Sequence, residues 1–231
     1  MLESGLYLVS TPIGNMEDIT LRAIRVLKEV DVIASEDTRR SGLLLKKYNI
    51  EKPLLSYHDH NKMERTPQII KRIKGGESFA LISDSGTPGI SDPGFYLVKE
   101  AIKEGIPVVP IPGPTALISG LIVSGLPTDR FAFEGFLPRR KGRRRKRLQQ
   151  LVNEERTMIF FEAPHRLLYF LQDLQEILGN RRIAVLRELT KKFEDTERGL
   201  VSEFINTYKQ KKPKGEFVIV VEGKKSYANK D

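Results

Sequence analysis

Short apolar runs alternate with helical patterns along the first half of the chain. Runs such as Leu6–Val9 and Phe79–Ile82 are bounded by serine, proline or glycine, which is typical of buried strands. Between such runs, apolar residues recur at helical spacing, for example Leu21, Ile24, Leu27 and Val30. Strand and helix alternate about five times in this way, which predicts a parallel α/β sheet.

The pattern breaks near Gly125, after a strongly apolar helical stretch. Phenylalanines at 131, 133 and 136 follow, and a basic run comes directly behind them. Strand-like and helix-like segments then resume and end in a β-branched run over 217–221. We therefore predict two unlike α/β domains, residues 1–125 and residues 126–231.

Three loops that follow predicted strands share one composition. They span Ser10–Asn15, Ser83–Gly94 and Pro110–Ala116, and each mixes glycine or proline with hydroxyl residues. Glycine lets a backbone approach a ligand closely, and proline fixes a loop in advance. Ligands of open parallel sheets bind beyond the carboxyl ends of the strands. The loops therefore indicate a site for a nucleoside-like ligand, and the alternative is a set of structural turns at a sheet edge.

The same loops do not match the known phosphate-binding motifs. The chain has neither the Walker A pattern nor the G-x-G-x-x-G fingerprint. The middle loop carries Asp84 and Asp92, whose carboxylates would repel a polyphosphate and favour a cationic ligand such as a sulfonium. The residues thus predict an adenosine-type cofactor that is poor in phosphate.

Positive charge is concentrated in one segment. The net charge is +9, and eight Lys and Arg residues lie in the run Arg139–Arg147. Without this run the basic and acidic residues nearly balance. So dense a patch favours an anionic partner, such as RNA, DNA or an acidic membrane surface. The alternative is a solvated linker.

Composition excludes several classes of protein. The chain has no cysteine, so disulfides, thiolate zinc sites and cysteine nucleophiles are excluded, and a cytoplasmic location is expected. No apolar run approaches the roughly 18 residues that span a bilayer, and the first residues lack the features of a signal peptide. We expect no membrane association.

Three charged groups at predicted strand ends are candidates for the catalytic base. Asp37 lies in SEDTRR, Glu162 in FFEAPHR and Lys191 in RELTKKFED. Each has a structural alternative. Asp37 could cap a helix and form surface ion pairs, Glu162 could satisfy the backbone at a helix start, and Lys191 could belong to a solvated run of charges. Lys191 could act only if it were desolvated enough to be neutral.

The segment His58–His60 raises the question of a metal site. Its two imidazoles and one carboxylate lie on a single extended stretch, which makes a partial metal site at best. A polar loop that faces substrate is the better interpretation. We predict no metal.

Several motifs occur in a fixed order along almost the whole chain. They are LYLVSTPIGNMEDIT, VIASEDTRRSGLLL, LISDSGTPGISDPG, PIPGPTA, GFLPRR, FFEAPHR, RELTKKFE and GEFVIVVEG. From about residue 5 to residue 223 the chain resembles the bacterial 16S ribosomal RNA cytidine 2′-O-ribose methyltransferases, which belong to the tetrapyrrole-methylase superfamily.

The resemblance implies two unlike α/β domains, with S-adenosylmethionine in the cleft between them, in a homodimer. It implies methylation of a cytidine ribose in the decoding region of 16S rRNA, within the small ribosomal subunit. Carried onto this sequence, the cofactor site would be lined by Pro12, Ser83, Asp84, Gly86, Thr87, Pro88, Ile90, Pro114, Thr115 and Ala116.

The basic run and three basic residues near predicted strand ends are the expected RNA contacts. They are Arg39, Arg139, Arg140, Arg143, Arg144, Arg145, Arg147, His165 and Arg166. Two other functions remain open at this point. One is a methylase of a tetrapyrrole or another small molecule, and the other is a non-catalytic protein that binds RNA or the ribosome.

Overall fold

The computed structural model describes residues 2–224 and shows two compact units that divide after Thr115. Each unit is an α/β unit, and the two are unlike, so the predicted fold class is confirmed. The division comes before helix α5 (Ala116–Val123), whereas the sequence placed the boundary behind this helix. The reason is packing, because a Cβ added at Gly120 would lie 2.8 Å from the Val218 side chain of the second unit.

The first unit is built on a fully parallel sheet with the strand order β3-β2-β4-β1-β5. Its strands are β1 (Gly5–Val9), β2 (Val32–Ser35), β3 (Leu54–Ser56), β4 (Ser78–Ile82) and β5 (Val108–Ile111). Its helices are α1 (Leu21–Glu29), α2 (Thr38–Lys47), α3 (Lys62–Lys74) and α4 (Gly94–Lys103), with a 3-10 turn η1 (Met16–Asp18).

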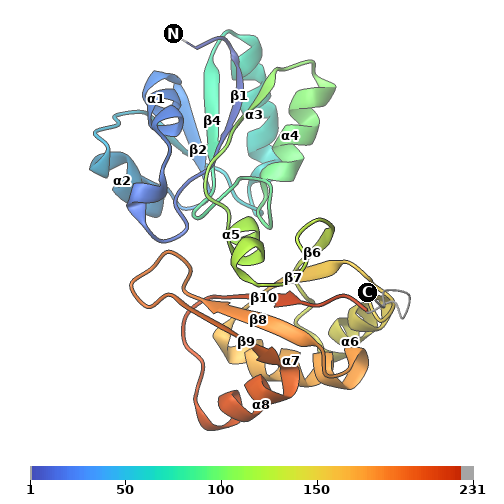
Figure 1. Cartoon of the computed structure of the whole chain (residues 1–231). Coiled ribbons are helices and arrows are strands. Elements are labelled where there is room, and N and C mark those ends of the chain that lie inside the picture. The colour runs from blue at the N-terminus through green and yellow to red at the C-terminus, as the bar shows by residue number, and fades with distance from the viewer. Residues whose placement is uncertain (1, 225–231) are drawn as a thin grey trace. The chain divides into compact units, whose positions relative to one another are not determined.

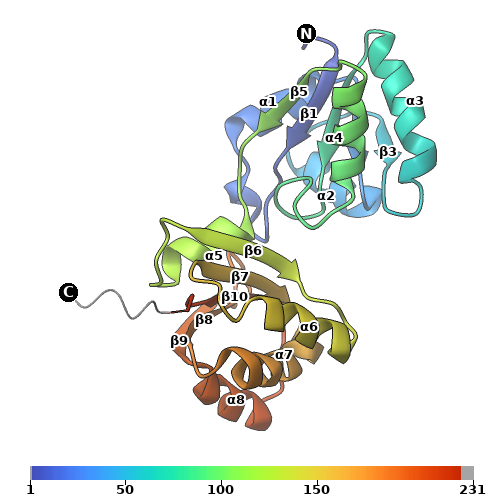
Figure 2. The same ribbon diagram turned by 90° about the vertical axis from the view of Figure 1, so that its right-hand side faces the viewer.

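Helices cover both faces of this sheet (Figures 1 and 2). Tyr7 and Val9 of β1 pack with α1 and α2, while Leu6 of the same strand packs with α3 and α4. Alternate residues of a strand point to opposite faces, so both faces of the central strands are buried. This explains why these strands are uninterrupted apolar runs in the sequence.

The second unit is built on a mixed sheet with the order β6-β7-β10-β8-β9. Strand β6 runs parallel to β7, and the other neighbouring strands are antiparallel. Its strands are β6 (Phe131–Phe136), β7 (Thr157–Glu162), β8 (Arg182–Arg187), β9 (Asp195–Leu200) and β10 (Phe217–Val221). Its further helices are α6 (Lys141–Gln150), α7 (Pro164–Leu178) and α8 (Val201–Gln210).

Figure 1 shows α7 and α8 on one face of this second sheet and α5 on the other. Phe160 and Ile219 face the core with α6, α7 and α8, whereas Ile159 and Val218 pack with α5. The alternation along β7 and β10 is again that of strands buried on both sides.

Two elements differ from the sequence-based interpretation. Strand β9 was not predicted, because it is an edge strand of mostly polar, exposed residues and has no apolar alternation. Helix α6 begins at Lys141, whereas the sequence predicts a helix that begins only at Lys146. Arginine and lysine are good helix formers, so the run is itself helical.

Within residues 2–224, the helices are all too short or too polar to span a lipid bilayer.

Candidate functional site

The three glycine- and proline-rich loops of the first unit lie together at the carboxyl edge of its sheet. Thr11 and Gly86 form a two-way backbone bridge, with N–H to O distances of 2.9 and 3.1 Å. The Ser10 and Thr87 hydroxyls are 2.9 Å apart, and the Thr87 hydroxyl donates to the Pro114 carbonyl at 3.4 Å. Strands β4, β1 and β5 are neighbours in the sheet, so their loops are brought side by side.

Gly86 shows why this crossing requires glycine. Its φ is +87°, a backbone conformation that side chains disfavour. A Cβ there would also lie 3.3 Å from the Ile13 side chain. The glycine therefore allows two loops to cross closely.

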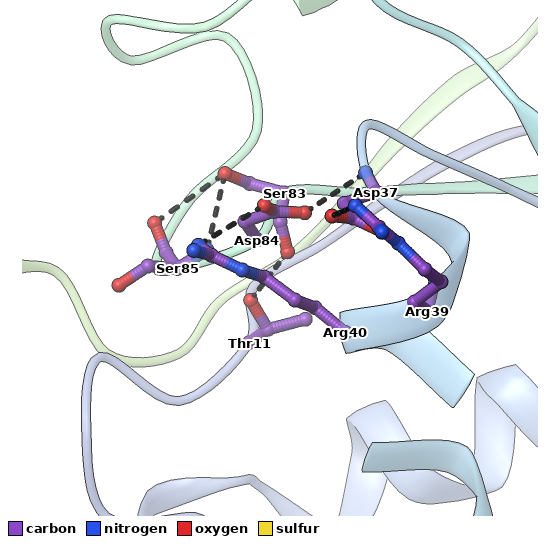
Figure 3. Close-up of polar contacts among 7 residues, drawn as sticks. All are labelled: Thr11, Asp37, Arg39, Arg40, Ser83, Asp84 and Ser85. Atoms are coloured by element: carbon purple, nitrogen blue, oxygen red, sulfur yellow. Dashed lines mark hydrogen bonds and ion pairs between the residues drawn. The ribbon is translucent and has the colours of Figure 1, made fainter. Parts of the chain in front are cut away.

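Asp84 joins this loop to the segment that follows β2 (Figure 3). Its carboxylate accepts the backbone N–H of Asp37 at 3.0 Å and lies 3.4 Å from the Arg40 guanidinium. The neighbouring Ser83 carbonyl accepts the Thr11 hydroxyl at 2.9 Å. Much of the acceptor capacity of Asp84 is thus used to hold the start of α2 in place.

Asp92 organises the far end of the same loop. Its Oδ1 accepts the N–H groups of Gly89 at 2.6 Å and Gly94 at 2.8 Å, while its buried Oδ2 has no hydrogen-bond partner within residues 2–224. A Cβ at Gly94 would lie 2.9 Å from the Gly89 nitrogen, so only glycine fits. A cavity of about 10 Å³ lies against this turn and is lined by Asp92, Ser83 and Glu36, among others.

Glu36 follows β2 and is exposed, yet its environment is electrostatically unfavourable for a charge. Desolvation raises the pKa of its carboxyl, and the negative charges of Asp84 and Asp92 add to that effect. A carboxylate that holds a proton more tightly than usual, and that solvent can reach, is suited to accept a proton from a substrate.

In the second unit, several loops gather at one end of the sheet. Phe136 pairs with Phe161, and Phe217 pairs with both Glu162 and Arg187. The ends of β6, β7 and β8 therefore lie along the same edge as the start of β10. We call this the aromatic edge, because Phe136 is 55% exposed there and Phe193, in the loop after β8, is 64% exposed.

The basic run divides into paired and unpaired cations. Arg144 is 6% exposed and donates to Asp173 at 2.7 Å, and Arg145 contacts both Asp173 and Glu176. Arg147 donates to Glu134. The exposed residues that form no ion pair within residues 2–224 are Arg139, Arg140, Lys141, Arg143 and Lys146.

Glu162 is buried at the end of β7. Its Oε1 accepts the Ala163 N–H at 2.9 Å and lies 3.1 Å from Arg166 Nε, while its Oε2 is buried without a hydrogen-bond partner among the described residues. Burial raises the pKa of this carboxyl, although the Ala163 N–H and Arg166 oppose the effect. Arg166 also donates to the Leu137 carbonyl, whereas His165 is exposed.

Lys191 lies in the loop between β8 and β9, between two carboxylates. Its ammonium is 3.0 Å from Glu188 and 2.9 Å from Glu216. Desolvation lowers the pKa of Lys191, but the hydrogen bonds to Glu216 and Glu188 outweigh it and leave that pKa raised. The ammonium is therefore held in its charged form.

With this geometry in place, the chain can be compared with known proteins. The family model of tetrapyrrole (corrin/porphyrin) methylases matches residues 5–205. The chain belongs to this methylase family.

Curated relatives extend the match over nearly the full chain. A Thermotoga maritima protein named ribosomal RNA small subunit methyltransferase I is 51% identical, over 95% of this chain and 98% of its own. A Haemophilus influenzae protein of the same name is 48% identical, over 98% of this chain and 81% of its own.

Among solved structures, the methylase fold recurs at low sequence identity. A Thermus thermophilus uroporphyrin-III C-methyl transferase, solved with S-adenosylhomocysteine, has a TM-score of 0.65 at 20% identity. The match covers 94% of this chain and 96% of that one. At this identity the likeness concerns the fold alone.

The methylase structure brings most of the expected cofactor residues together, in different degrees of exposure. Pro12, Gly86 and Pro88 are buried and support the loops, and Ile90 is 41% exposed. The half-buried members within the first unit are Ser83, Asp84, Thr87, Pro114 and Thr115. Ala116 is the first residue of α5 and is assigned to the second unit.

The three expected catalytic groups of this methylase are not equally suited to accept a proton. Asp37 caps α2 and pairs with Arg39, and the hydrogen bonds from Arg39 lower its pKa to about 2. Lys191 is held charged, so the condition for its use as a base is not met. Glu162 has a raised pKa, but its side chain is fully buried beside Arg166.

Several expected RNA contacts have structural partners instead. The burial of Arg144 is incompatible with the expected contact to phosphate, and Arg145, Arg147 and Arg166 are tied to acidic groups. Arg39 is exposed but pairs with Asp37. The partners of Arg144 and Arg145 lie 28 to 31 residues away along the chain, so the sequence could not reveal them.

Two groups were missed as site candidates. Glu36 directly precedes Asp37 in SEDTRR, but the sequence alone does not single it out, since its raised pKa depends on burial and on Asp84 and Asp92 from another loop. The segment Lys209–Lys214 was passed over because the arginine run is denser, yet it holds four lysines directly before β10. A count of basic residues per window would have found it.

Proposed function

We propose that the chain is an S-adenosylmethionine-dependent methyltransferase of small-subunit ribosomal RNA, which methylates the 2′-hydroxyl of a cytidine ribose in 16S rRNA. The observation that carries the proposal is the 51% identity to a ribosomal RNA small subunit methyltransferase I over 95% of the chain. The choice of the cytidine 2′-oxygen rests on the motifs that resemble the ribose methyltransferases.

The loops at the carboxyl edge of the first sheet have the donor set that the cofactor requires. They offer hydroxyls and backbone groups from Ser83, Thr87 and Thr115, and half-buried carboxylates at Asp84 and Asp92. Negative charge favours a sulfonium, and no lysine in these loops is placed for a polyphosphate. When bound, S-adenosylmethionine supplies an electrophilic methyl group.

The chain must also remove the proton of the attacking hydroxyl. We assign this to Glu36, which is exposed and whose pKa is raised by desolvation and by the neighbouring carboxylates. A general base typically contributes about 10²–10⁴-fold to the rate, and the alignment of the hydroxyl contributes further.

RNA would be held by the unpaired cations of α6 and the loop before it, chiefly Arg139, Arg140 and Arg143. Contacts to phosphate position an RNA without reading its sequence. The proposal includes a homodimer in the cytoplasm, and light scattering on the purified chain tests the dimer.

The test is a methyl-transfer assay with labelled S-adenosylmethionine. Undermethylated small ribosomal subunits, naked 16S rRNA and a tetrapyrrole precursor are offered side by side, and nucleosides are analysed by mass spectrometry. We expect label in 2′-O-methylcytidine from the subunits. Label in the tetrapyrrole alone would replace the proposal with a small-molecule methylase. Cofactor binding without label in any substrate would indicate a non-catalytic RNA-binding protein.

A further inference from the structure

The loop between β8 and β9 is fixed in an unusual conformation. Glu188 and Thr190 have φ values of +53° and +65°, in the left-handed region that favours glycine. Backbone strain of this kind persists only where surrounding contacts hold it, and it is often found at functional sites. Such contacts are present in this loop.

Internal bonds tie the β8–β9 loop to the segment that leads into β10. Glu188 accepts the Glu216 N–H at 2.9 Å, and Lys191 bridges the two carboxylates. Gly215, with φ +95°, lies so close that a Cβ there would be 2.6 Å from Glu188 Cγ. The two segments therefore behave as one rigid unit.

This rigid unit exposes a large aromatic ring. Phe193 is 64% exposed, and the Lys192 ammonium lies 5.7 Å from its ring centroid. An apolar ring of this size, held in water by a strained loop, has no role in the core. A preformed ring loses little conformational freedom when it binds a partner.

Lys192 precedes the ring in the chain, and further lysines lie on the segment beside the loop. The segment before Gly215 carries Lys211, Lys212 and Lys214, which are exposed and form no ion pair within residues 2–224. Because Gly215 contacts Glu188, this segment lies directly beside the β8–β9 loop, as Figure 1 shows for the chain that enters β10. An exposed aromatic ring flanked by unpaired lysines is the composition of a single-stranded nucleic-acid platform.

We propose that Phe193 stacks on a nucleobase of the RNA substrate, while Lys192, Lys212 and Lys214 contact the flanking phosphates. This inference rests on the proposed function, since it takes RNA as the substrate. It adds a second contact region to the one on α6. Both regions lie on the second unit, because Phe136 at the end of β6 and the β8–β9 loop share the aromatic edge.

The chain itself supplies a clean probe, because it contains no tryptophan. The variant Phe193→Trp places the only tryptophan of the chain at the proposed stacking site, where it can be excited selectively over the tyrosines. We expect single-stranded 16S rRNA fragments to quench its fluorescence. The matched control is Phe95→Trp on α4, where the native ring is 70% exposed and lies in the other unit, and we expect no quenching there.

Affinity is measured on the same RNA with Phe193→Ala and Phe193→Leu. Loss of one base stack is expected to weaken binding roughly 10-fold in both variants, since leucine keeps the apolar surface but not the aromatic face. Affinity for S-adenosylmethionine and the melting temperature should stay unchanged, because the side chain is exposed.

Several results would overturn the inference. The stacking contact would be excluded if Phe193→Ala bound RNA as tightly as the unchanged protein, or if RNA did not quench Phe193→Trp. The proposed function would stand in either case. A change of oligomeric state in Phe193→Ala with unchanged RNA affinity would identify a protein contact instead. Quenching by a tetrapyrrole but not by RNA would remove the inference and the proposed function together.

Discussion

The strand-end loops of the two units use charged groups in different ways. In the first unit, the carboxylates of Asp84 and Asp92 accept backbone N–H groups and hold the loops in place. In the second unit, the aromatic edge leaves Phe136 and Phe193 in solvent, and part of the basic run has no acidic partner among residues 2–224.

The difference shows that a count of charges overstates binding capacity. Arg144 and Arg145 are as basic as Arg143, yet they attach α6 to α7 through Asp173. Likewise Asp84 carries the charge expected near a sulfonium, but it also fixes the start of α2. Local composition indicates the kind of ligand, and long-range partners decide which residues can reach it.

The largest effect is expected from Glu36→Gln in the first unit. Removal of the proton acceptor should lower the methyl-transfer rate by about 10²-fold or more, with cofactor affinity nearly unchanged. The pH–rate profile of the unchanged protein should rise through a pKa above the ordinary value of glutamate, because desolvation and the nearby carboxylates raise it. A rate unaffected by the substitution would exclude Glu36 as the base.

Although Glu36→Gln should lower the methyl-transfer rate, it should raise the stability of the fold at neutral pH. The folded-state pKa of Glu36 is raised. The contribution of this group to the free energy of unfolding is therefore present at low pH and is lost as the pH rises through that pKa. At pH 7 the ionised carboxylate therefore destabilises the fold, and Glu36→Gln should unfold at higher urea than the unchanged protein. The difference should disappear near pH 3. Greater stability of the unchanged protein at pH 7 would contradict this sign.

The next effect separates two neighbours in the basic run. Arg144→Met leaves Asp173 buried with only Arg145 beside it, and should cost about 3 kcal/mol of unfolding free energy. Arg143→Met removes an exposed cation and should change stability by less than about 0.5 kcal/mol. Urea unfolding measures both. Equal losses in the two variants would show that the division into paired and unpaired cations is wrong.

The smallest effect concerns the salt dependence of RNA binding. The triple variant Arg139→Gln, Arg140→Gln and Arg143→Gln should reduce the slope of log K against log salt by about 2, at about 0.7 per phosphate contact. Arg25→Gln on α1, whose native side chain pairs with Glu29, is the control and should leave the slope unchanged. Filter binding over a salt series gives both slopes. An unchanged slope in the triple variant would place the phosphates elsewhere.

Much of the fold could be predicted from the sequence because the signals are local. The buried strands of both sheets are short apolar runs between turn residues, and the loops after β1, β4 and β5 are rich in glycine and proline. Strand β9 was missed because its residues are polar and it is held by pairing with β8 alone. The domain boundary depends on which of the two sheets α5 packs against. The sequence of α5 is almost uniformly apolar, so it does not indicate which sheet that is.

The candidate site was less predictable because the ionisation of its side chains depends on their contacts in the fold, several of which are distant in sequence. Asp37 and Lys191 lie at strand ends as expected, but Arg39 lowers the pKa of the first and Glu216 contributes to the raised pKa of the second. The raised pKa of Glu36 requires carboxylates more than forty residues away. Motif position therefore located the loops, while the ionisation of their side chains required the fold.

The place of β1 inside its sheet has a consequence for how the chain acquires its structure. This strand precedes the other strands of its sheet along the chain, yet its two neighbours are β4, which ends at Ile82, and β5, which ends at Ile111. An apolar strand must therefore wait for most of the first unit before it can pair, and such distant pairings form slowly. In the second unit β8 and β9 are joined by a short loop and can pair as soon as they are made. We expect refolding of the first unit to be the slower of the two, and a holdase that covers residues 5–9 to matter most until β4 and β5 have been made.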